Sequence, residues 1–441
     1  MKLFLFALLA AAAAFPSAAD ARLSAAEKKM VQVVEQEQAR ALGLLETLVN
    51  QNSGSMNLSG VEAVGRMMRA ELEPLGFEVR WVPMEHTGRA GHIVATHKGN
   101  GRGKKMLLIG HLDTVFEPDS PFQRFELKGD RAEGPGIGDD KGGMVVMVAA
   151  LRAMKAAGTL KDADIEIVLT GDEERPGAPI EAARADLIAA GKRADVALDF
   201  EGLSQEGGVD IGSIARRSST SWELKTTAKS GHSSGIFAKG VGDGAIYELA
   251  RIIAAFRQEL PEPNLTFNVG LIAGGATAAT DEQGVRATAT GKTNIIPAIA
   301  IARGDLRTLS DAQTERVRAR MQAIVARSPL AGTQAELTFK KDGYPPMAPT
   351  EGNRALLARL NLVNRDMGLP QMGELDPAKR GAGDISFVAN DVDGLIGLGT
   401  AGTRSHAPGE DIEIASLDRQ AKRAAILMSR LAREKAPPNR N

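Results

Sequence analysis

The sequence predicts a mixed α/β fold in which a mostly parallel sheet carries helices on both faces and a smaller α+β domain interrupts it. Short, continuous apolar runs alternate with helical stretches along much of the chain, which is typical of strands buried on both faces. Between residues 215 and 342 the strands instead alternate apolar and polar residues, as in a sheet with one solvent-exposed face. After residue 342 the chain again has a continuous apolar run and a helical stretch, as it has before residue 215.

The elements of the first kind follow in chain order. A helix is expected over residues 24–48, with Ser24 as its N-cap. The expected buried strands are Met106–Ile109, Ile165–Leu169, Val196–Leu198 and Leu395–Leu398. Two further helices are expected over residues 142–157 and 416–434. Strands that alternate with helices in this way build a sheet covered by helices on both faces.

The interrupting stretch contains two helix-plus-strand units. Its expected strands are residues 221–226 and 298–306, and its expected helices are residues 243–260 and 311–327. The chain therefore divides into a first domain built from residues 22–214 and 343–441 and an inserted domain built from residues 215–342.

Composition excludes several classes of protein. The chain has 54 Lys plus Arg against 55 Asp plus Glu, and its aromatic residues are only 13 Phe, 2 Trp and 2 Tyr. A chain without basic excess and with few stacking side chains is not expected to bind nucleic acid. The absence of cysteine excludes disulfide scaffolds, cysteine-based zinc fingers and cysteine nucleophiles. With only six histidines, any metal site must rely on carboxylates.

Residues 1–21 have the pattern of a cleaved secretory signal peptide. Lys2 supplies a positive charge, residues 3–14 are an apolar run, and residues 19–21 (Ala-Asp-Ala) offer small residues before a cleavage point. The run is too short for a comfortable membrane span, which needs about 20 apolar residues. We expect a secreted or periplasmic protein whose mature form is not embedded in a membrane.

Polar residues with metal-binding chemistry follow each of the four buried strands. In chain order they are His111 with Asp113, Glu173 with Glu174, Asp199 with Glu201, and His406 in a glycine-rich loop. A further acidic pair, Asp139 and Asp140, precedes the helix that begins near residue 142. Ligands of open α/β sheets bind beyond the carboxyl ends of the strands, so these side chains are expected to converge.

Gathered carboxylates repel one another unless cations compensate them, and zinc accepts both imidazole nitrogen and carboxylate oxygen. Three carboxylates and a bridging hydroxide balance two divalent ions, with the two histidines as terminal ligands. The set that fits is His111, Asp139, Glu174, Glu201 and His406. Asp113 is placed to accept the second ring N–H of His111, and Glu173 is left as the general base. Spacing alone does not separate Asp139 from Asp140, or Glu201 from Asp199.

Three motifs together resemble a known family of metallopeptidases and deacylases. They are His111-Leu112-Asp113-Thr114-Val115, the glycine-rich residues 134–143, and Asp172-Glu173-Glu174. The family includes glutamate carboxypeptidase of the carboxypeptidase G type, acetylornithine deacetylase, succinyl-diaminopimelate desuccinylase and aminoacylase-1. The resemblance extends from about residue 40 to residue 430. It implies two Zn2+ ions per subunit, with Co2+ or Mn2+ as alternatives, and it favours Asp139 as the bridging ligand and Glu201 as a terminal one.

The same resemblance implies roles for residues outside the strand tips. The inserted domain resembles the lid or dimerisation domain of the family, which implies a homodimer. His232 matches the histidine that helps to polarise the scissile carbonyl. Asn294 and Arg307 match substrate-binding residues, the arginine gripping a carboxylate. Gly381 and Gly383 match the glycine-rich substrate loop.

These features predict a secreted di-zinc metallohydrolase that cleaves an amide bond with metal-activated water. The favoured activity is that of a carboxypeptidase releasing a C-terminal amino acid, and the alternatives are an N-acyl-amino-acid deacylase or a dipeptidase. The substrate is expected to be a small peptide or an N-acyl amino acid. An inactive, metal-free binding protein on the same fold would have lost ligands, whereas here all five ligand positions and the base carry suitable residues.

Overall fold

The computed structural model describes residues 23–281 and 284–435, and its first sheet has six strands. The predicted signal peptide, residues 1–21, lies outside the described residues. The strands lie in the order β1 (Glu78–Pro83), β2 (Gly91–His97), β6 (Ile165–Thr170), β3 (Met106–His111), β7 (Val196–Asp199) and β17 (Gly394–Leu395). Strands β6, β3, β7 and β17 run parallel, while β1 and β2 pair antiparallel at one edge. The predicted mixed, mostly parallel sheet is confirmed.

The last strand is shorter than its sequence predicts. We expected a strand through Leu398, but β17 ends at Leu395. The chain leaves the sheet because Ile396 donates its N–H to Ser213 and Gly397 has a φ of +86°.

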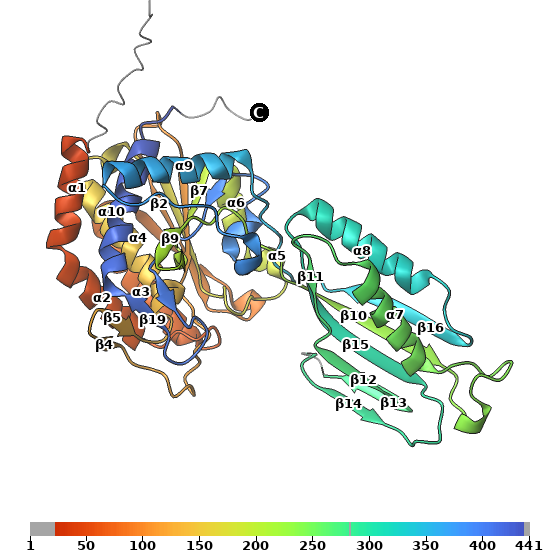
Figure 1. Ribbon diagram of the computed structural model, residues 1–441. Coiled ribbons are helices and arrows are strands. Elements are labelled where there is room, and N and C mark those ends of the chain that lie inside the picture. Colours follow the sequence, from red (N-terminus) through yellow and green to blue (C-terminus); the bar gives the residue numbers. More distant parts are fainter. Residues whose placement is uncertain (1–22, 282–283, 436–441) are drawn as a thin grey trace, which may run out of the picture.

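Helices cover both faces of this sheet (Figure 1). Leu108 and Ile167 point into a large core with one set of helices, whereas the alternate residues Leu107 and Val168 point into a second core with α6 (Ala185–Arg193). The first set is α1 (Ala25–Gln36), α2 (Gln38–Asn50), α3 (Leu58–Leu72), α4 (Gly142–Ala156), α9 (Glu351–Asp366) and α10 (Ile414–Leu431).

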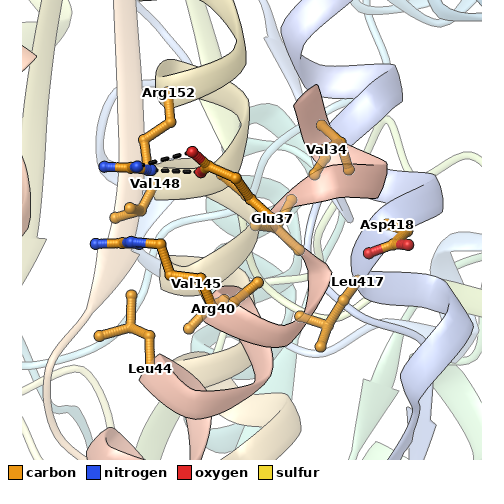
Figure 2. A pocket seen from close by; sticks show the side chains of 13 residues that line it. Val34, Glu37, Arg40, Leu44, Val145, Val148, Arg152, Leu417 and Asp418 are labelled. Carbon is orange, nitrogen blue, oxygen red and sulfur yellow. Dashed lines mark hydrogen bonds and ion pairs between the residues drawn. The ribbon is translucent and has the colours of Figure 1, made fainter. Parts of the chain in front are cut away.

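The predicted N-terminal helix is in fact two helices. Ser24 caps α1 through a capping box with Glu27, as expected from its position. The helix breaks at Glu37, which lies between α1 and α2 and pairs with Arg152 of α4 through two hydrogen bonds (Figure 2). The crevice beside this pair holds about 10 Å³, which is room for about one water molecule and no substrate.

Two small sheets lie near the strand tips. One has the order β18 (Gly402–Thr403), β19 (Asp411–Glu413), β5 (Arg131–Glu133) and β4 (Glu126–Lys128). The other is the hairpin of β8 (Ser204–Glu206) and β9 (Val209–Ile211). The first small sheet fixes the loop that carries His406 against the segment that leads to Asp139.

The inserted stretch forms a separate antiparallel sheet, which extends away from the first domain in green and teal in Figure 1. Its strands follow the order β11 (Thr266–Phe267), β15 (Ile299–Arg307), β10 (Thr220–Ala228) and β16 (Thr333–Phe339), and β12 (Leu271–Gly275) also pairs with β15. A two-stranded sheet of β13 (Thr277–Thr280) and β14 (Ala287–Thr290) adjoins it. Helices α7 (Ala245–Glu259) and α8 (Asp311–Ala326) enclose a core with the inward residues of β10 and β15, including Trp222 and Leu224.

Two short backbone connections join the inserted domain to the first. Arg216 pairs with Met347, and Ser219 pairs with Tyr344, in antiparallel bridges. In the part of the chain that the structure describes, no helix is both long and apolar enough to cross a membrane.

Candidate metal centre and active site

Two histidines and two carboxylates meet at the carboxyl ends of the parallel strands. The Nε2 atom of His111 lies 3.0 Å from Oδ1 of Asp139. The Nε2 atom of His406 lies 3.1 Å from Oδ2 of Asp139 and 3.1 Å from Oε2 of Glu174. Ligand atoms of His111, Asp139 and Glu174 all lie within 4.8 Å of one another. Four of the five predicted metal ligands are therefore brought together.

Asp113 fixes two strand tips at once. The Nδ1 atom of His111 lies 3.1 Å from the carbonyl oxygen of Asp113 and 3.4 Å from its carboxylate, so Nε2 is left to face the cluster. The Asp113 carboxylate also accepts the backbone N–H groups of Glu173 at 3.0 Å and Glu174 at 3.1 Å, and the hydroxyl of Ser55. The predicted partner of His111 thus also holds the loop after β6.

A buried glutamate that sequence analysis missed holds the loop of Asp139. The carboxylate of Glu410 accepts backbone N–H groups of Gly136 at 3.1 Å, Gly138 at 2.8 Å and Asp139 at 3.0 Å. Burial raises the pKa of Glu410 to about 8, and the nearby Asp139 adds to this rise. Its partners are backbone groups more than 270 positions away in the chain, so no sequence spacing indicates the contact.

The two acids of the Asp139–Asp140 pair have different surroundings. Asp139 faces both histidines, whereas Oδ2 of Asp140 accepts the backbone N–H of His111 at 3.3 Å. Asp140 is fully buried, and burial raises its pKa well above the usual range. The geometry favours Asp139 as the residue that bridges the two histidines.

Glu201 and Asp199 also separate in the structure. Oδ1 of Asp199 accepts the backbone N–H of Glu201 at 3.0 Å, so this side chain turns back on its own strand end. Both carboxylates pair with Arg216, but Oε2 of Glu201 also lies 3.5 Å from the guanidinium of Arg380. The fifth predicted ligand is thus held by arginines at the edge of the cluster.

The electrostatics of the cluster match those of a site for cations. Hydrogen bonds to Asp139 and Glu174 raise the pKa of His406 to about 11. Burial raises the pKa of Glu174 to about 7, against the opposing hydrogen bond from His406. Oε1 of Glu174 is buried without a hydrogen-bond partner. Carboxylate oxygens and imidazole nitrogens are ligands that zinc and similar divalent ions accept, and this oxygen has no other partner.

Glu173, the predicted base, is half-buried beside this cluster. Burial raises its pKa well above the usual range, and the charge of Glu201 adds to the rise. Its carbonyl oxygen accepts the hydroxyl of Tyr344 at 2.7 Å. A carboxyl group with a raised pKa beside candidate metal ligands is suited to accept and return a proton.

Arg184 organises the back of the site, and sequence analysis missed it. This fully buried guanidinium donates to Asp172 at 2.6 Å and to Asp384 at 2.7 Å, and its NH2 group lies 2.9 Å from the hydroxyl of Tyr344. It therefore ties the loop of Glu173 to the glycine-rich loop that contains Asp384. A single arginine between two short helices gave no sequence signal for this role.

The glycines of the predicted substrate loop lie next to Glu201. A Cβ atom on Gly383 would lie 2.3 Å from the guanidinium of Arg216 and 2.7 Å from Oε1 of Glu201. The carbonyl oxygen of Gly381 lies 3.4 Å from the same guanidinium. A side chain at position 383 would therefore displace the side chains of Arg216 and Glu201.

The predicted residues of the inserted domain are not gathered at the cluster in this structure. His232 is exposed and bonds Ser234 at 2.7 Å, close to Asn294. Arg307 bonds Asp305 at 3.0 Å and ends β15, whose other end at Ile299 lies near Asn294. At about 3.3 Å per residue, the two ends of this strand lie roughly 25 Å apart.

A histidine–carboxylate cluster at the carboxyl ends of a mostly parallel sheet defines a metal-dependent hydrolase of the α/β class. The sequence pattern of peptidase family M20/M25/M40 matches residues 107–430, and the chain belongs to this family. The chain is thus an enzyme of the metallopeptidase and amidohydrolase type, as the resemblance implied.

The similarity to known proteins extends over nearly the whole chain. Carboxypeptidase G2 of Pseudomonas sp. (strain RS-16) is 29% identical over 95% of this chain and 96% of its own length. Succinyl-diaminopimelate desuccinylase of Leptothrix cholodnii is 25% identical over 85% of this chain and 94% of its own length. A tripeptidase from Staphylococcus aureus shares the fold with a TM-score of 0.69 and 20% identity, over 90% of this chain and 99% of that one. A dinuclear metal-binding M20 peptidase from Bacillus subtilis has a TM-score of 0.62 and 16% identity, over 90% and 98%.

Proposed function

We propose that this protein is a di-zinc amidohydrolase that acts as a carboxypeptidase and releases a C-terminal amino acid from a small peptide. The observation that carries the proposal is the convergence of His111, Asp139, Glu174 and His406 beside the half-buried acid Glu173. The similarity to a carboxypeptidase along 96% of that protein's length supports the peptide as substrate.

The cluster and Glu201 would hold the two ions, which would supply an activated water and polarise the substrate carbonyl. Glu173 takes a proton from the attacking water and later delivers it to the leaving amine. Asp113 keeps the ring of His111 in one orientation throughout. His232 would add a hydrogen bond to the carbonyl oxygen, and Arg307 would hold the carboxylate of the substrate, once the inserted domain approaches the first.

A deacylase of N-acyl amino acids is the second candidate, because a desuccinylase is similar to 85% of the chain. A dipeptidase would use the same residues on a shorter peptide. A metal-free binding protein is disfavoured by the buried, unpartnered Oε1 of Glu174, since such an atom costs stability unless a ligand satisfies it.

Secretion and dimerisation also belong to the proposal. The pattern of residues 1–21 supports export to the periplasm or the medium. His232 is exposed and its ring bonds Ser234 rather than a residue of the cluster, which supports a homodimer or a closing motion that would bring the histidine to the substrate.

Hydrolysis by the purified protein tests the proposal. A peptide with C-terminal glutamate, an N-acetyl amino acid and a dipeptide are each assayed before and after chelation and again after zinc is restored. We expect hydrolysis that chelation abolishes and zinc restores, with the peptide cleaved fastest. Activity that survives complete removal of metal would refute the mechanism, and faster cleavage of the N-acyl amino acid would assign the protein as a deacylase.

A further inference from the structure

The peptide group that follows the base Glu173 is held from both sides. Its N–H belongs to Glu174 and donates to the carboxylate of Asp113 at 3.1 Å, and its carbonyl oxygen accepts the hydroxyl of Tyr344 at 2.7 Å. Asp113 also accepts the N–H of Glu173 itself at 3.0 Å. Among the described residues, every hydrogen bond of Glu173 runs through its backbone. The direction in which its side chain leaves the loop therefore depends on Asp113 and Tyr344.

Tyr344 reaches this peptide group from one of the two connections between the domains. Its backbone N–H donates to the carbonyl oxygen of Ser219 at 2.9 Å, and its own carbonyl oxygen accepts the N–H of Ser219 at 3.0 Å. Ser219 directly precedes β10, which pairs on both sides within the inserted sheet. One residue thus bonds the start of β10 through its backbone and the loop of Glu173 through its side chain.

Arg184 fixes the direction of the Tyr344 hydroxyl. Its NH2 group lies 2.9 Å from the hydroxyl oxygen and can only donate, so the single hydroxyl hydrogen is left for the carbonyl oxygen of Glu173. Burial raises the pKa of Tyr344 well above its usual value, so the phenol keeps this hydrogen. The ring itself packs against Phe387, with the ring centroids 5.0 Å apart. Tyr344→Phe would therefore keep the ring packing and remove only the hydrogen bonds.

We propose that Tyr344 is a positioning residue for the base, and that it holds the carboxylate of Glu173 in place for proton transfer from the connection to the inserted domain. The inference rests on the proposed amide hydrolysis, in which Glu173 is the base. A general base must lie within hydrogen-bond reach of the proton that it takes. Because a small displacement of a reacting group is costly, a loosened loop lowers the rate even when metal and substrate still bind.

Hydrolysis by the zinc-loaded variant Tyr344→Phe tests this role. The substrate is whichever peptide or N-acyl amino acid the unmodified protein cleaves fastest. We expect kcat to fall about tenfold and KM to change less than twofold, because the base is misplaced while the residues that bind metal and substrate are kept. The matched control is Tyr247→Phe. Tyr247 is the only other tyrosine of the chain and is exposed on α7, so its kcat should not change.

A double-mutant cycle separates positioning of the base from a general structural effect. In Glu173→Gln no base is left to position, so adding Tyr344→Phe should lower the residual rate less than twofold. A partial loss of folded or zinc-loaded protein would instead lower kcat by the same factor in both backgrounds. Equal factors in the two backgrounds, or an unchanged kcat in Tyr344→Phe, would overturn the proposal.

Amide hydrogen exchange keeps the inference separate from the proposed reaction. On the zinc-loaded protein, we expect the backbone N–H groups of residues 171–177 to exchange at least threefold faster in Tyr344→Phe and at an unchanged rate in Tyr247→Phe. If no amide substrate is cleaved but this local difference appears, the reaction is wrong and Tyr344 still holds the loop of Glu173. If substrate is cleaved but Tyr344→Phe changes neither kcat nor this exchange, the positioning role is wrong and the reaction stands.

Discussion

The strand-tip cluster of the first domain and the polar residues of the inserted domain are held in very different ways. Asp113, Glu410 and Arg184 are buried and fix the cluster through hydrogen bonds to backbone and side chains from distant segments. His232 is exposed and its ring bonds only to Ser234, two residues along the chain. The cluster is therefore held by contacts from distant segments, whereas the ring of His232 is held only by a local contact within the inserted domain.

The largest expected effect comes from removing the base within the organised cluster. Glu173→Gln keeps the shape of the side chain but removes its ability to accept a proton, so kcat should fall by about a thousandfold or more. Zinc content and melting temperature should change little, because the contacts that hold Glu173 run through its backbone. The control is Glu181→Gln, an exposed residue at the start of α5 (Ile180–Ala183). A loss of activity that merely tracks lost zinc would show that Glu173 is a structural residue.

A smaller effect is expected from the inserted domain. His232→Ala should lower kcat by about a hundredfold, the cost of one hydrogen bond to the carbonyl oxygen in the transition state. Stability and zinc content should not change, because the side chain is exposed and bonds only to Ser234. His86→Ala, at another exposed histidine, is the matched control. An unchanged kcat in His232→Ala would show that His232 takes no part in catalysis and that the first domain alone supplies the catalytic residues.

The support beneath Asp139 should give a still smaller effect. Glu410→Gln replaces one acceptor oxygen by an NH2 group. This donor would face a backbone N–H group that now donates to the Glu410 carboxylate, so a hydrogen bond is lost. We expect zinc affinity to fall by about ten- to a hundredfold, as for other residues that orient metal ligands. The measurement is a competition titration against a chelator, and Glu126→Gln on β4 is the control. Unaltered affinity would mean that the loop of Asp139 keeps its shape without Glu410.

The same contrast explains how far sequence alone could predict this site. The strands and the acids and histidines that follow them were predictable, because apolar runs locate the strands and the topology gathers their ends. Glu410 and Arg184 were not predictable, since Glu410 binds backbone groups more than 270 positions away and Arg184 joins Asp172 to Asp384, which lies 200 positions from it. The early end of β17 was missed for a similar reason, because Ile396 pairs with Ser213 rather than with the sheet.

Residues of the inserted domain show another limit. The alternating pattern predicted its strands, and Trp222 and Leu224 face the core as a strand with one wet side requires. The pattern carries no information about where the sheet lies relative to the first domain. The position of His232 relative to the cluster therefore depends on the two short connections at Arg216 and Ser219, which sequence periodicity does not describe.

The number of protons released on metal binding also distinguishes the strand-tip cluster from the inserted domain. The pKa of His406 is raised to about 11, so its proton stabilises the metal-free fold fully below about pH 6.5, and this contribution is lost as the pH rises toward 11. A metal ion must displace this proton, and below about pH 7 it must also displace one from Glu174, whose pKa is raised to about 7.

Zinc affinity should therefore rise with pH, by about tenfold per unit for each proton released, and more steeply below pH 7 than above it. Calorimetry in buffers of different ionisation enthalpy counts the protons, and we expect at least one at pH 8 and about one more at pH 6. His232→Ala should leave both counts unchanged, because that side chain has no contact with the cluster in this structure. Equal counts at the two pH values would show that Glu174 is not protonated in the metal-free cluster.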